Sequence, residues 1–78
     1  MREKQQRLIV TFRTTTGAMA MEKAAREAAL PGRLIPVPRC ISAGCGLCWS
    51  SPPDVREQLE KLVIREKLDV DGIYTVLL

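Results

Sequence analysis

The pattern of hydrophobic and polar positions predicts four short β-strands. In residues 7–13 (RLIVTFR), Leu8, Val10 and Phe12 fall on one face of a strand, and a more polar set falls on the other. Three further strands are expected at residues 33–37, 47–50 and 73–78. Pro36 has no N–H to donate to a neighbouring strand, so it favours an edge position for the second strand.

Two other segments show the period of amphipathic helices. The first helix is expected from about Thr16 to Ala29; the threonines before it offer N-caps, and Pro31-Gly32 ends it. Its apolar face is expected to carry Ala18, Met21, Ala25, Ala28 and Ala29. The second helix is expected at about residues 53–67. Its apolar stripe is expected to carry Val55, Leu59, Leu62, Val63 and Glu66.

The resulting order, βαββαβ, predicts an α+β fold of the ferredoxin-like type. In this fold four antiparallel strands form one sheet, and both helices cover the same face. Residues 1–6 are expected to form a charged tail and residues 7–78 a single small domain. The other face of the sheet would be open and lined in part by Ile9 and Ile35. An exposed apolar sheet face favours a homodimer.

Composition and charge narrow the classes of function. No apolar run approaches the roughly 20 residues that span a bilayer. The apolar stretch after the charged start is also too short for a secretion signal, which indicates a cytoplasmic protein. The chain has a net charge of +3. Its basic residues are interleaved with glutamates rather than concentrated on one face with aromatic groups. We therefore expect no nucleic-acid partner.

The candidate chemistry is concentrated in three cysteines, Cys40, Cys45 and Cys48, and the chain has no histidine. In a reducing compartment, clustered cysteines more often serve catalysis or metal binding than structural disulfides. An odd number also leaves one thiol outside any intramolecular pairing scheme. Without histidine, the usual partner of a hydrolytic cysteine is missing.

One interpretation makes Cys45 a reactive thiolate that carries sulfur or selenium. A thiolate is stabilised by nearby positive charge and by backbone N–H groups. Arg39 is the nearest cation in sequence. Gly44 and Gly46 tolerate the positive φ values that turn successive N–H groups toward one anion.

Three alternatives stay open. Cys45 and Cys48 form a C-x-x-C pair, the spacing of dithiol redox centres, although the residues that follow look like a strand rather than a helix. Cys40, Cys45 and Cys48 could hold zinc or an iron–sulfur cluster if a fourth ligand came from elsewhere. Finally, Cys40 and Cys48 could be small buried hydrophobic residues.

The stretch from Leu8 to Ser50 resembles the selenium/sulfur carrier protein-like family of small bacterial proteins and domains. The residues that carry the resemblance are the strand 8–12, a helix with Ala18 and Glu22, the block Arg33–Arg39 (RLIPVPR) and the block Ser42–Leu47 (SAGCGL). The resemblance implies that Cys45 is the carrier position and that Arg39 and the flanking glycines frame it. Cys40 and Cys48 could resolve a persulfide on Cys45 as a disulfide.

These considerations predict a carrier rather than an enzyme with its own substrate pocket, and no cofactor unless the metal alternative holds. Cys45 would lie on a loop between the two central strands. The expected partners are a desulfurase-like protein that donates sulfur or selenium and a protein that accepts it.

Overall fold

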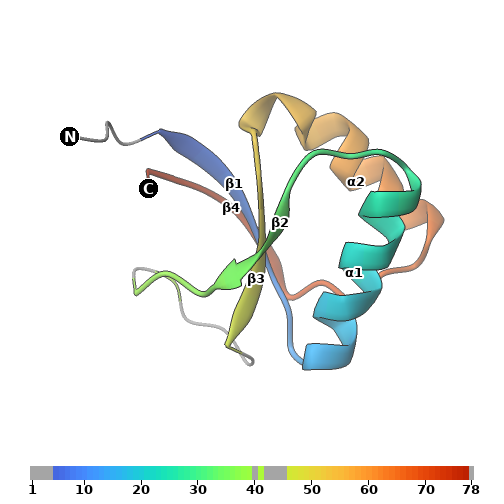
Figure 1. The fold of residues 1–78 in the computed structure, drawn as a ribbon, viewed down its shortest axis with the longest axis horizontal. Helices are drawn as coiled ribbons and strands as arrows, with labels where there is room; N and C mark the ends of the chain where they lie inside the picture. Colours follow the sequence, from blue (N-terminus) through green and yellow to red (C-terminus); the bar gives the residue numbers. More distant parts are fainter. Residues whose placement is uncertain (1–4, 40, 42–45, 78) are drawn as a thin grey trace.

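A four-stranded antiparallel sheet carries two helices on one side (Figure 1). This computed structural model describes residues 5–39, 41 and 46–77. The elements in chain order are β1 (Gln6–Thr11), α1 (Thr15–Glu27), β2 (Arg33–Pro36), β3 (Leu47–Ser51), the 3₁₀ turn η1 (Pro53–Val55), α2 (Arg56–Arg65) and β4 (Gly72–Leu77). The predicted ferredoxin-like α+β fold is confirmed. No helix among the described residues is long and apolar enough to cross a membrane.

The strand order across the sheet is β2-β3-β1-β4, with every neighbouring pair antiparallel. β2 lies at one edge, as Pro36 predicts. The connection that contains Cys45 therefore joins an edge strand to a central strand. The expectation that it would join the two central strands is wrong, because β3 lies between β1 and β2.

The start of α1 agrees with the sequence, but its end does not. The Thr14 hydroxyl accepts a hydrogen bond from the N–H of Gly17 at 3.1 Å, as expected of an N-cap. The helix ends at Glu27 because Ala29 adopts a left-handed conformation, with φ of 56°. Ala28 and Ala29, which were expected on the buried face, are exposed.

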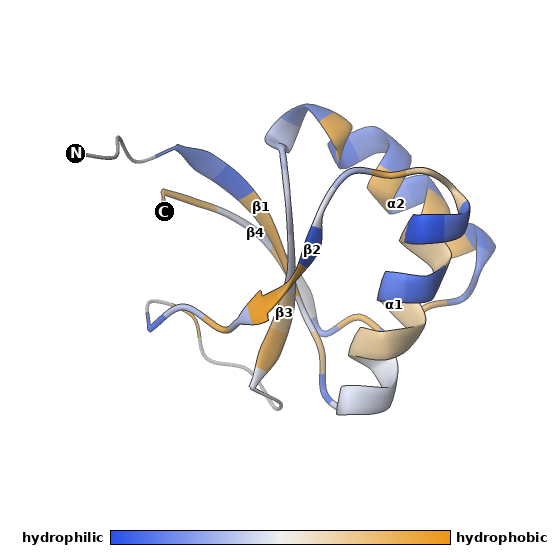
Figure 2. Ribbon diagram, in the orientation of Figure 1, coloured by the Kyte–Doolittle hydropathy of each residue, from blue (hydrophilic) through white to orange (hydrophobic). Residues whose placement is uncertain are grey.

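α2 is shorter than expected at both ends, since η1 precedes Arg56–Arg65. Leu59 and Leu62 are buried, and the two valines of the predicted stripe are partly buried. Glu66 lies beyond the end of the helix and is exposed, so its expected place in the stripe is wrong. Hydrophilic and hydrophobic residues alternate along α2 (Figure 2), which is why the helix lies on the surface with one side against the sheet.

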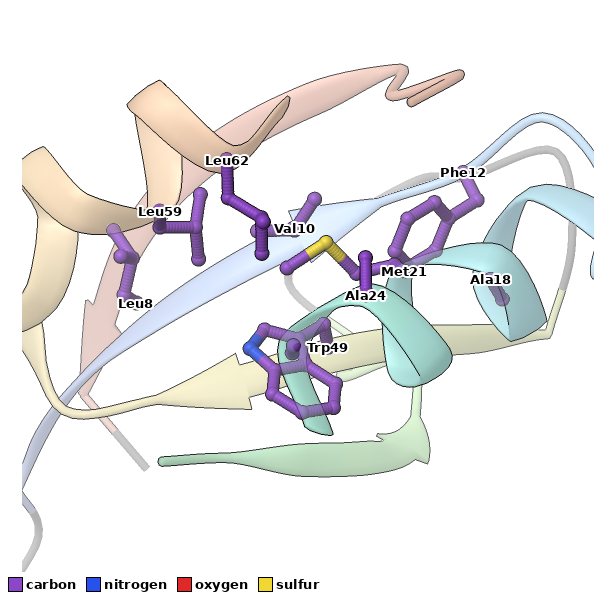
Figure 3. Close-up of a cluster of buried hydrophobic side chains, with 10 residues drawn as sticks. Leu8, Val10, Phe12, Ala18, Met21, Ala24, Trp49, Leu59 and Leu62 are labelled. Carbon is purple, nitrogen blue, oxygen red and sulfur yellow. The ribbon is translucent and has the colours of Figure 1, made fainter. Parts of the chain in front are cut away.

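The hydrophobic core fills the space between the sheet and the helices (Figure 3). Leu8, Val10 and Phe12 of the first strand and its extension share this side, as the alternation predicts. The remaining buried members of the cluster are Ala18, Met21, Ala24, Ala25, Trp49, Leu59 and Leu62.

The face of the sheet without helices is less open than expected. Ile9, Thr11 and Cys48 occupy alternate positions of the two central strands and are fully buried. Ser50 is also buried. The expectation that Ile9 lines an exposed face is therefore wrong.

Candidate functional site

The connection between β2 and β3, here called the cysteine segment (residues 37–46), is held at its base. Pro36 lies opposite Leu47 in the last pair of the β2–β3 ladder. Beyond this pair, the N–H of Val37 donates to the carbonyl of Gly46 at 3.0 Å. The two ends of the cysteine segment are therefore tied together by backbone bonds that continue the sheet.

The described start of the cysteine segment projects on the side of the sheet away from the helices (Figure 1). The N–H of Ile41 donates to the carbonyl of Pro38 at 3.1 Å, a spacing typical of a tight turn. Arg39 is exposed, and no salt bridge joins it to another of the described residues. Its guanidinium can thus interact with an external anion.

Cys48 is the second residue of β3 and is fully buried. Its cross-strand neighbours are Ile35 on β2 and Thr11 on β1. The thiol donates to the carbonyl of Pro36, with the sulfur 3.9 Å from that oxygen. A thiol in this position can react with a protein partner only after the β2–β3 pair opens locally.

Gly46 lies at the end of the cysteine segment and is exposed. Its φ depends on the preceding residue, which lies outside the described residues, so the part expected of Gly46 in anion binding stays a prediction. Among the described residues, no atom would lie within 4 Å of a Cβ added at Gly46.

Three of the predicted site residues, Cys40, Gly44 and Cys45, lie outside the described residues, so their roles stay predictions. The same is true of the three-thiolate metal site, since two of its ligands are among them. Within residues 5–39, 41 and 46–77, no group of three or more His, Cys, Asp or Glu side chains could hold a metal ion. The structure thus describes the residues around the cysteine segment but not the sulfur of Cys45.

Charge is distributed unequally between the two layers of the molecule. The charged residues of the four strands and of the described part of the cysteine segment are all cationic: Arg7, Arg33 and Arg39. Every acidic residue in the described part of the chain lies in a helix, in η1 or in the α2–β4 connection. Arg7 and Arg33 both lie beside Ser50, at the end of the strands away from the Pro36–Leu47 pair, whereas Arg39 belongs to the cysteine segment itself.

The sequence alone did not predict that Arg7 and Ser50 interact on the side of the sheet without helices. The Nε of Arg7 donates to the Ser50 hydroxyl at 3.1 Å, although 43 positions separate them in the chain. Ser50 also lies opposite Arg33 on β2. Only the strand register brings these residues together, and no local motif signals it.

One comparison with known proteins matches most of the chain. A family model described as "Putative Se/S carrier protein-like" matches residues 7–75. The match includes both helices and the complete cysteine segment, so it extends beyond the Leu8–Ser50 stretch that carries the resemblance. No curated protein and no solved structure matches the chain.

Proposed function

The chain belongs to the Se/S carrier protein-like family, and we propose that it carries sulfane sulfur or selenium on the thiolate of Cys45. It accepts the atom from a desulfurase-like donor protein in the cytoplasm and passes it to an acceptor protein. It acts as a carrier rather than as an enzyme.

The burial of Cys48 is the observation that carries the assignment to Cys45. A carrier thiol must be reached by two different proteins in turn. Cys48 is fully buried and its thiol bonds to the carbonyl of Pro36. Of the two remaining cysteines, Cys45 stands between glycines, which leave its side chain little local cover.

The transfer requires no external oxidant or reductant. The Cys45 thiolate attacks the terminal sulfur of a persulfide on the donor, R–S–S⁻. The donor S–S bond breaks as the new S–S bond forms, so the products are a Cys45 persulfide and the donor thiolate. A selenium atom carried as R–S–Se⁻ would be transferred in the same way. The acceptor then removes the terminal atom by an equivalent displacement.

The charge distribution supports this chemistry. The thiolate and the persulfide are both anions, and positive charge favours both over the protonated thiol. Arg39 lies in the same segment as Cys45 and is exposed.

Intact-protein mass spectrometry tests the proposal most directly. The wild-type protein and the variants Cys45→Ser, Cys40→Ser and Cys48→Ser would be incubated with a persulfide donor and then weighed with and without reductant. We expect a reducible gain of about one sulfur mass in the wild type that only Cys45→Ser abolishes. The two other variants are matched controls, because each removes one thiol from the same region.

The same samples distinguish the alternatives. Near-stoichiometric zinc or iron that is lost when any cysteine is replaced would indicate a metal-binding module. A loss of two mass units on mild oxidation that requires both Cys45 and Cys48 would indicate a dithiol redox protein. An adduct that persists in Cys45→Ser would contradict the assignment of the carrier thiol.

A further inference from the structure

The two edges of the sheet are protected to very different degrees. β2 has four residues and carries both Arg33 and Pro36. Short length, charge and proline are the features by which proteins prevent an edge strand from pairing with another chain. β4 has six residues (GIYTVL) and contains neither a charged residue nor a proline. Figure 2 shows the hydrophilic start of β2 in dark blue, a colour that β4 lacks.

β4 has the properties of a strand that can accept another partner. Among the described strands it pairs with β1 and lies at the edge of the sheet. Alternate N–H and C=O groups of an edge strand point away from its neighbour and are available for pairing. The segment is rich in β-branched and aromatic residues. Tyr74 and Leu77 are 42% and 60% exposed, and by alternation they lie on opposite faces of the sheet.

We propose that β4 pairs with β4 of a second copy of this chain, antiparallel and across a two-fold axis. A strand that meets its own copy in this way is self-complementary only if like charges do not come together. β4 satisfies this condition because Gly72–Leu77 carries no charge. The product is one continuous sheet of twice the width, with all the helices on the same side.

The strand order keeps the cysteine segments away from this interface. β2 and β4 are the outermost strands, so three inter-strand spacings separate them, roughly 15 Å. Each cysteine segment would lie at an outer end of the joined sheet and would stay accessible to other proteins. The dimer proposal therefore holds whether or not Cys45 carries sulfur or selenium.

Sedimentation velocity of the full chain tests the proposal across concentrations from about 1 μM to about 1 mM. We expect the wild type to move from one to two times 8.7 kDa as the concentration rises. Tyr74→Lys and Leu77→Lys each place a positive charge on β4, one on each face of the sheet. Each variant should weaken dimer association at least about tenfold. Ile64→Lys is the matched control, because Ile64 is 77% exposed but lies on α2.

Hydrogen exchange of the wild type provides a second measurement that needs no variant. Amides of β4 should become more protected at high concentration than at low concentration, whereas amides of β2 should not change. A protein that stays monomeric to the highest concentration would overturn the proposal. A dimer that forms equally well in both β4 variants, or that Ile64→Lys disrupts as strongly, would overturn it too, since another surface would then be responsible.

Discussion

Cys48 and Trp49 are adjacent on β3 but lie in two different environments. Trp49 points to the helix side and belongs to the hydrophobic core (Figure 3). Cys48 is buried on the other side, among residues that include Ile9, Thr11 and Ser50. The helix side is mostly apolar, with the buried hydroxyl of Ser51 as an exception, and is closed by two helices. The other side contains a thiol, hydroxyls and arginine.

The difference between the two sides shows how this small domain combines a stabilising core with polar and reactive groups. Burial of large apolar side chains is the dominant favourable term in folding, and most such side chains lie on the helix side. Polar and reactive groups can then occupy the other side at little expense in stability. Ile9 shows that the division is not absolute, because it is fully buried on the side without helices. Four substitutions test the comparison.

Phe12→Ala should have the largest effect. Phe12 is fully buried in the core on the helix side, and its removal would leave a cavity between α1 and the sheet. We expect the free energy of unfolding to fall by about 3–5 kcal/mol, measured by chemical denaturation. Ile64→Ala, at an exposed position of α2, is the control and should change it by less than about 0.5 kcal/mol. A loss below about 1 kcal/mol for Phe12→Ala would mean that the helix side does not dominate stability.

Gly32→Ala should have the next largest effect. Gly32 has φ of 146°, and an added Cβ would lie 2.6 Å from the Trp49 ring and 2.7 Å from the Ser50 carbonyl oxygen. We expect destabilisation of more than about 1 kcal/mol. Gly46→Ala is the matched control, because a Cβ there would have no atom of the described residues within 4 Å. Equal melting temperatures for the two variants would contradict the close approach of Gly32 to Trp49.

Cys48→Ser examines the side without helices. A hydroxyl replaces a buried thiol, and we expect a loss of about 1–2 kcal/mol in the free energy of unfolding. In the wild type, alkylation of Cys48, followed by mass spectrometry of its peptide, should be slow until the protein unfolds. Rapid alkylation of Cys48 in the native protein would contradict its burial and would weaken the assignment of the carrier role to Cys45.

Arg7→Met should have the smallest effect. It removes the hydrogen bond from Arg7 to Ser50 but keeps an apolar stem of similar length. We expect the free energy of unfolding to fall by about 0.5–1 kcal/mol. A double-mutant cycle with Ser50→Ala isolates the energy of the pair. A loss above about 2 kcal/mol would show that the polar groups on this side contribute more to stability than the comparison allows.

Much of the fold and part of the site follow from short-range signals in the sequence. The alternation of Leu8, Val10 and Phe12, the cap at Thr14 and the proline at position 36 each depend on chemistry within a few residues. They predicted the order of the elements, the buried face of the first strand and the edge position of β2. The cysteines flanked by proline and glycine likewise indicate the cysteine segment as the candidate site, and the roles of Cys40, Gly44 and Cys45 stay predictions.

The other features depend on residues that are far apart in the chain. α1 ends early because Ala29 takes a left-handed conformation as the chain turns back toward the sheet. Arg7 meets Ser50, Gly32 meets Trp49, and Cys48 becomes buried only because the strands align in one register. The sequence alone determined which residues prefer a strand, a helix or a turn. The tertiary structure decided which of them are buried, exposed or in contact, because those properties depend on packing between elements.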